Sequence, residues 1–294
     1  MKTPVVPLLL QHSEKPAAVA ARSQFPARLG ADKSAAVPAV RQESSVKRPV
    51  GVGAAKELVK PTVPGLGTAL GKLAANHVGS YLAVRTRMVQ KLADQGVTHV
   101  QVLASMGSVK RHHFVDTALA AMAYEDTSLP IGLGQTISKP NVVARMLELL
   151  MHGLQAKDGR LGRVLEIGTG CGYQAALLSQ LATEVYSMER LRGLHDKARE
   201  NLRTLRLPNV HLLFGDGMPG YPKGAPYAAI IAAAGGEAIP VAWTDQLAVG
   251  GRLVAPLQDA KGAQALLVID KTSQGLRQSL LEAVHFVPLK SGIG

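Results

Sequence analysis

The sequence has almost no cysteine, no cluster of metal-binding side chains and no long apolar run. Its single cysteine, Cys171, excludes an internal disulfide framework and fits a reducing compartment. No apolar stretch approaches the ~18 residues of a membrane span, and two prolines interrupt the short apolar run at the start, which argues against a signal peptide. We therefore expect a cytoplasmic protein without a metal or a membrane partner.

The net charge is strongly positive, but its distribution along the chain argues against a nucleic-acid partner. The formal net charge is +12, and residues 1–75 carry 11 Lys or Arg against 4 acidic residues, with eight of the 17 prolines and one aromatic residue, Phe25. Such a segment cannot bury enough apolar surface to offset the entropy of ordering it. We predict a disordered basic extension over residues 1–75, with a weak contact to an acidic partner as the alternative, and a folded domain over residues 76–294.

Apolar content of 47% supports a globular domain over the remaining chain. In the first part of this domain, residues 76–160, apolar residues recur at helical spacing. This part also contains the glycine- and proline-rich stretch YEDTSLPIGLGQTISKP. The predicted helices of this part cover residues 81–96, 98–106, 115–123 and 141–154.

From residue 161 to residue 294, strand-like and helix-like segments alternate. This alternation predicts an α/β fold: a doubly wound, mostly parallel sheet with helices on both faces. The predicted strands cover residues 163–168, 184–189, 210–216, 227–234 and 251–257, with a closing pair over 266–272 and 281–289. The predicted helices cover residues 172–182, 191–206 and 237–250.

Three glycines follow the first of these strands in VLEIGTGCGYQ. Gly168, Gly170 and Gly172 allow a tight turn and a close approach of backbone to ligand, and the helix that follows offers free N–H groups. The spacing departs from the dinucleotide fingerprint, because Tyr173 occupies the position of its third glycine, and a Walker lysine is absent. The loop therefore favours neither a dinucleotide nor a nucleoside triphosphate.

Acidic residues end the next two predicted strands. Glu189 is placed where a carboxylate can accept both hydroxyls of a ribose, and Asp216 where a polar group can meet an adenine. This layout suits a nucleoside ligand without pyrophosphate, such as S-adenosylmethionine. The alternatives are a surface ion pair of Glu189 with Arg190 or Arg192, and a turn or cap role for Asp216.

With these residues placed, the chain resembles the protein-L-isoaspartate O-methyltransferase family over residues 81–294. The resemblance implies a Rossmann-like methyltransferase fold, S-adenosylmethionine as cofactor, and methyl transfer to the free carboxylate of isoaspartyl residues. The ester then closes to a succinimide, whose hydrolysis returns some normal aspartate, so the partners are damaged proteins and peptides. We expect a monomer. The matching segments are RMVQKLADQGV, KRHHFV, YEDTSLPIGLGQTISKP, VLEIGTGCGYQAALLSQL, VYSMER, GDGMPGYP and GGRLVAPL.

The resemblance also implies roles for individual residues. Ser138 matches the active-site serine, and we assign it to orienting the isoaspartyl carboxylate; no His–Asp partners stand at recognisable positions for a nucleophilic serine. A helix N-cap before Pro140 is the alternative. The cofactor-binding set is Gln135, Thr136, Glu166, Gly168, Thr169, Gly170, Gly172, Glu189, Asp216 and Gly217. The substrate-binding set is Ile137, Ser138, Ala233, Ala234, Val254 and Pro256.

Several positions depart from the family pattern, and among them Ala233 and Ala234 leave the substrate loop less polar than in many members. Cys171 stands where serine is frequent, and Ala228 stands where aspartate is common. His112 and His113 match a family position outside the active site, and we expect a structural role for them. Two other hypotheses stay open: a methyltransferase that acts on RNA or a small molecule, and a non-catalytic protein that keeps the fold and the cofactor.

Overall fold

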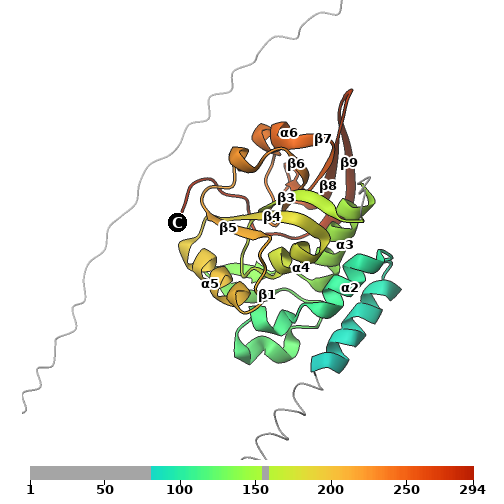
Figure 1. Cartoon of the computed structure of the whole chain (residues 1–294), viewed down its shortest axis with the longest axis vertical. Coiled ribbons are helices and arrows are strands. Elements are labelled where there is room, and N and C mark those ends of the chain that lie inside the picture. The colour runs from blue at the N-terminus through green and yellow to red at the C-terminus, as the bar shows by residue number, and fades with distance from the viewer. Residues whose placement is uncertain (1–80, 154–158) are drawn as a thin grey trace, which may run out of the picture. The chain divides into compact units, whose positions relative to one another are not determined.

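The computed structural model describes residues 81–153 and 159–294 (Figure 1). The extension predicted over residues 1–75 lies outside the described residues. All described residues belong to one compact unit. Within the described ranges, no helix is long and apolar enough to cross a membrane.

The first helices form largely as predicted. A helix covers residues 81–94, and α2 (Val100–Ser108) follows it. The helix predicted over residues 115–123 is instead a 3₁₀ helix, η2 (Thr117–Met122), which follows another, η1 (Arg111–Phe114). Asp116 makes no side-chain cap bond to η2, and such short 3₁₀ runs are common as connectors.

The glycine-rich stretch forms a small hairpin that the sequence did not predict. Strands β1 (Leu129–Gly132) and β2 (Gln135–Ile137) pair antiparallel. The turn between them has positive φ at Gly132, Leu133 and Gly134, with values of 101°, 52° and 69°. Two glycines make this left-handed turn accessible at low cost. Helix α3 (Pro140–His152) then begins and confirms the helix predicted there.

The central sheet is mostly parallel, as predicted. Its seven strands lie in the order β5-β4-β3-β6-β7-β8-β9; the first five are parallel, and β8 and β9 are antiparallel to their neighbours. Because the carboxyl ends of parallel strands meet at one edge, loops from distant parts of the sequence converge there. The strands are β3 (Leu161–Ile167), β4 (Ala182–Glu189), β5 (Val210–Phe214), β6 (Tyr227–Ala232), β7 (Leu247–Gln258), β8 (Gln264–Thr272) and β9 (Gly275–Val284).

Helices lie between these strands, and one is much shorter than predicted. Helices α4 (Tyr173–Leu181) and α5 (Arg192–Arg203) confirm two predictions, and the short η3 (Pro222–Gly224) precedes β6. The helix predicted over residues 237–250 is reduced to α6 (Val241–Gln246). Its last four predicted residues, 247–250, already belong to strand β7, because Leu247 pairs with Tyr227 of β6.

The closing strand pair is displaced from its predicted position. Strand β9 begins at Gly275 and ends at Val284, whereas the sequence predicted residues 281–289. Residues 285–289 leave the sheet, and the Gly235 N–H donates to Val287 O at 2.9 Å. These residues therefore run past the loop that follows β6 rather than along β8.

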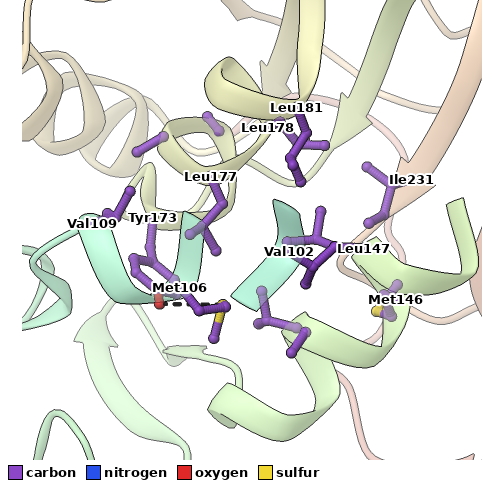
Figure 2. Close-up of a cluster of buried hydrophobic side chains, with 14 of the residues drawn as sticks. Val102, Met106, Val109, Met146, Leu147, Tyr173, Leu177, Leu178, Leu181 and Ile231 are labelled. Carbon is purple, nitrogen blue, oxygen red and sulfur yellow. Dashed lines mark hydrogen bonds between the residues drawn. The ribbon is translucent and has the colours of Figure 1, made fainter. Parts of the chain in front are cut away.

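Alternate strand residues build two apolar clusters, one on each face of the sheet. Val164 belongs to the cluster that contains α2, α3 and α4, whereas its neighbour Leu165 belongs to the cluster that contains Trp243 of α6. Figure 2 shows part of the first cluster, where Met106 of α2 lies beside Tyr173 of α4. Helices therefore cover both faces, which confirms the predicted fold class.

Candidate functional site

The glycine loop after β3 adopts a conformation that favours glycine. Gly168, Gly170 and Gly172 have φ values of 91°, 56° and 90°, in the left-handed region. A Cβ at Gly170 would lie 3.2 Å from Ile131 Cδ1. One at Gly172 would lie 3.1 Å from the side chain of Leu202. The loop therefore packs against the β1–β2 hairpin on one side and against α5 on another.

Glu189 supports this loop from the end of β4. Its side chain is buried, Oε2 accepts a hydrogen bond from the Gly170 N–H at 2.9 Å, and Oε1 accepts one from the Leu191 N–H at 2.9 Å. The alternative of an ion pair with Arg190 or Arg192 is wrong, since neither guanidinium lies within 4.0 Å of this carboxylate. A carboxylate has further lone pairs, so ribose hydroxyls can still bind to it.

Glu166 lies beneath the loop rather than in contact with the cavity. Its side chain is fully buried, and the Ser187 hydroxyl donates to Oε2. Ser187 and Thr169 share a second hydrogen bond of 2.6 Å. Burial raises the pKa of Glu166 to about 8, so the carboxyl holds its proton at neutral pH. The structure thus makes Glu166 an indirect support of Thr169.

Asp216 and Gly217 are placed differently from one another. Gly217 lines the cavity described below, but Asp216 does not. The Asp216 carboxylate accepts hydrogen bonds from the N–H of Met218 at 2.8 Å and of Gly292 at 2.6 Å. These bonds match the turn role that we kept as the alternative for Asp216, and they connect this turn to the C-terminal segment.

Ser138 follows the GQTI strand and lies half-buried at the cavity wall. The N-cap residue of α3 is Lys139, and the free N–H of Asn141 in the first turn donates to Asp126 Oδ1 at 2.9 Å, so the N-cap alternative for Ser138 is wrong. The backbone oxygen of Ser138 accepts a hydrogen bond of 2.8 Å from Arg111. The serine is thus held through its backbone.

A cavity of about 460 Å³ brings most of the predicted residues together at the carboxyl ends of the strands. The predicted residues that line it are Gln135, Thr136, Ile137, Ser138, Gly168, Thr169, Gly170, Glu189, Gly217, Ala233 and Ala234. Five predicted residues do not line it: Glu166, Gly172, Asp216, Val254 and Pro256. Val254 and Pro256 are buried within β7, where Val254 belongs to the core, and Gly172 faces α5.

The cavity also contains residues that the sequence did not indicate. One group lies at the start of α4 and consists of Tyr173 and Gln174. The amide nitrogen of Gln174 is buried and has no hydrogen-bond partner. A second group, Val287 to Lys290, belongs to the displaced C-terminal segment, which the sequence predicted as a strand up to Leu289. Cys171 lines the cavity as well, and burial raises the pKa of its thiol to about 11.

The remaining residues that the sequence singled out lie away from the cavity wall. His112 shares a 2.6 Å hydrogen bond with the hydroxyl of Tyr124 and stacks on Tyr81, which fits a structural role. Ala228 lies near the start of β6, at the end of the strand opposite the cavity. No group of three or more His, Cys, Asp or Glu side chains in the described ranges could hold a metal ion.

Comparisons with known proteins identify the family of this chain. The family model for protein-L-isoaspartate(D-aspartate) O-methyltransferase matches residues 83–294. The chain is 55% identical over 276 residues to the protein-L-isoaspartate O-methyltransferase of Methylibium petroleiphilum, covering 92% of this chain and 96% of that protein. It is 57% identical over 227 residues to the enzyme of the same name from Leptothrix cholodnii, covering 76% and 80%.

Solved structures give the same result. A protein-L-isoaspartate O-methyltransferase has a TM-score of 0.64 and 27% identity, covering 71% of this chain and 67% of that one. A putative enzyme of this kind from Plasmodium falciparum, in complex with S-adenosyl-L-homocysteine, has a TM-score of 0.61 and 24% identity, covering 70% and 98%, and supports the fold. The family match covers the whole cavity, and this chain belongs to the protein-L-isoaspartate O-methyltransferase family.

Proposed function

We propose that this chain transfers a methyl group from S-adenosylmethionine to the free carboxylate of L-isoaspartyl residues in damaged proteins and peptides. One observation carries the proposal: the GQTIS segment and the glycine loop, separated by α3 and β3 in the sequence, line the same cavity. The resemblance places the GQTIS segment across the active site, with Ser138 at the acceptor, and assigns the glycine loop to the cofactor.

The residues present fit the cofactor. Gly168 and Gly170 present backbone without side chains at the cavity, and Glu189 offers carboxylate oxygens for the ribose hydroxyls. Gly217 would lie on the adenine side, while Asp216 would act through the turn that it caps. When bound, S-adenosylmethionine supplies a methyl group on a sulfonium, which is an activated donor.

The acceptor side needs positioning rather than acid–base chemistry. A carboxyl group has a pKa near ~4, so the isoaspartyl acceptor is already an anion at neutral pH. Ser138 would hydrogen-bond this carboxylate and orient it toward the donor. Ala233, whose N–H donates to Ile167 O at 2.8 Å, would form an apolar part of the wall that excludes water.

The decisive experiment measures transfer of label from S-adenosylmethionine to a synthetic isoaspartyl peptide. The matched control is the same peptide with ordinary aspartate. We expect methylation of the first and not of the second. Binding of the cofactor without methylation of either peptide would favour the open alternatives, another acceptor or a non-catalytic protein.

We also infer protein and peptide partners for this chain. The family name specifies an aspartyl-derived group in proteins. Thr136, which lines the cavity, is exposed, so the cavity is open to solvent on this side. The monomeric state, the cytoplasmic location and the lack of a nucleic-acid partner stay predictions from the sequence.

A further inference from the structure

Arg111, in the KRHHFV segment, carries a charge deep inside the domain. Its side chain is fully buried, and no carboxylate among the described residues forms an ion pair with it. Burial lowers the pKa of Arg111, but a guanidinium stays protonated at neutral pH. Burying such a charge without a counterion costs free energy, so its contacts must explain why it is there.

Two of these contacts join the end of η2, which lies six residues before β1, to the residue that follows β2. The Nε–H group donates to the backbone oxygen of Ala123 at 2.7 Å, and Nη2 donates to the backbone oxygen of Ser138 at 2.8 Å. Ala123 precedes β1, and Ser138 follows β2. One rigid guanidinium therefore fixes the separation of the two chain segments that enter and leave the hairpin.

The third contact reaches the helix that follows the glycine loop. The guanidinium lies over the ring of Tyr173, with Cζ 4.9 Å from the ring centroid. The Tyr173 ring is also held by an edge contact with Phe114, at a centroid distance of 5.5 Å, and its hydroxyl donates to Met106 Sδ at 3.7 Å. Figure 2 shows Tyr173 and Met106 packed together in this core.

Two of the three partners, Ser138 and Tyr173, line the cavity, whereas Arg111 itself does not. Ser138 belongs to the acceptor side and Tyr173 to the start of the helix on the cofactor side. We propose that Arg111 is a positioning residue for methyl transfer: it fixes the backbone of Ser138 relative to Tyr173, and so places the acceptor side of the cavity against the cofactor side. This inference rests on the function proposed above.

Arginine suits this position better than lysine. Its N–H groups lie in one plane and at fixed angles, so two carbonyl oxygens can be held at once while the flat face covers an aromatic ring. A lysine ammonium keeps the charge, but it is a flexible point donor and cannot reproduce both bonds together with the ring contact. Arg111→Lys therefore separates geometry from charge.

The test uses the full-length protein and the variant Arg111→Lys, with Arg163→Lys as the matched control. Arg163 is half-exposed and pairs with Glu184 at the opposite end of β4 from the cavity. Three quantities are measured: kcat with the isoaspartyl peptide, Kd for S-adenosyl-L-homocysteine by calorimetry, and hydrogen exchange by mass spectrometry. We expect Arg111→Lys to lower kcat at least tenfold, to change this Kd less than threefold, and to speed exchange mainly over residues 123–139. The control should match the wild type.

Other results would overturn the inference. Wild-type kcat in a folded Arg111→Lys protein, or a parallel loss of kcat and of S-adenosyl-L-homocysteine affinity, would each contradict a positioning role. If this variant does not fold, Arg111→Gln is measured in the same way; if neither folds, Arg111 serves folding and the inference is rejected. A wild-type protein that methylates no isoaspartyl peptide would instead contradict the proposed function, while the exchange and affinity measurements would still report on Arg111.

Discussion

The carboxylate of Glu189 accepts a hydrogen bond from the backbone N–H of Gly170 at 2.9 Å. This bond joins the end of β4 to the glycine loop after β3, so the carboxylate that we propose for the ribose also holds the proposed cofactor loop. The other carboxylate oxygen of Glu189 accepts a hydrogen bond from the N–H of Leu191, the residue before α5. We therefore expect cofactor affinity and loop geometry to depend on the same side chain.

We expect Glu189→Ala to weaken binding of S-adenosyl-L-homocysteine by about 1–3 kcal/mol, because the ribose hydroxyls and two backbone N–H groups lose their acceptor. Isothermal titration calorimetry measures the change. Glu184→Ala is the control, since Glu184 lies near the start of the same strand and pairs with exposed Arg163. Equal affinities of wild type and Glu189→Ala would show that Glu189 does not bind the cofactor.

Ser138→Ala should lower kcat for the isoaspartyl peptide with little effect on cofactor affinity. The backbone bond from Arg111 to Ser138 does not involve the hydroxyl, so the hairpin should keep its position in this variant. Steady-state kinetics with labelled S-adenosylmethionine measures the loss. Ser128→Ala, at an exposed serine before the same hairpin, is the control. An unchanged kcat in Ser138→Ala would remove the serine from the mechanism.

Glu148 should make stability depend on pH. One of its oxygens accepts hydrogen bonds from Thr98 N–H at 2.6 Å, Thr98 Oγ1 at 3.0 Å and His99 N–H at 2.9 Å. Arg145 binds the other at 3.1 Å. Burial alone would raise the pKa of Glu148, but these bonds to Thr98, His99 and Arg145 outweigh burial and hold it below its ordinary 4.5.

Because this pKa is lowered in the folded protein, the stabilisation is complete above the unfolded pKa and is lost as the pH falls through the folded pKa. We expect Glu148→Gln to reduce the free energy of unfolding at pH 7 by roughly 1.5–3 kcal/mol and to flatten its fall below pH 4.5. Urea unfolding across this pH range measures both effects. Glu282→Gln, which removes the more exposed partner of Arg145, should cost about 1 kcal/mol or less.

Cys171 should be unreactive in the folded protein. Its thiol is buried and its pKa is raised to about 11, so almost none of it is the nucleophilic thiolate at pH 8. Iodoacetamide should label the denatured protein fully and the native protein very slowly, as followed by mass spectrometry. Cys171→Ser, which restores the serine frequent in this loop, should keep kcat near that of the wild type. Rapid labelling of the native protein would show that this loop opens to solvent.

Deletion of residues 1–75 should leave activity nearly intact. The family match begins at residue 83, and every residue that lines the cavity follows residue 130. Methylation of the isoaspartyl peptide by the truncated and full-length proteins, at equal concentrations, gives the comparison. An insoluble or inactive truncation would show that the extension is part of the fold.

The repeating apolar pattern and the glycine loop already specified much of this protein. Strand and helix periodicity in residues 161–294 determined a mostly parallel sheet with helices on both faces, since each pattern reflects which side of an element is buried. The spacing of Gly168, Gly170 and Gly172 predicted a tight loop, and their left-handed φ values confirm it; together with Glu189 at the next strand end it indicated a nucleoside ligand. These features are local, so neighbouring residues contain the information.

Tertiary packing decided what local patterns do not encode. The Asp216 carboxylate binds the N–H of Gly292, 76 residues later, and the VPL segment lines the cavity instead of extending a strand. Arg111 reaches Ser138 across 27 residues, and no local pattern in the sequence predicts this contact. A hydrogen bond between distant residues depends on how whole elements pack. For this reason the sequence determined the sheet and the glycine loop, and the tertiary structure decided which side chains support the site.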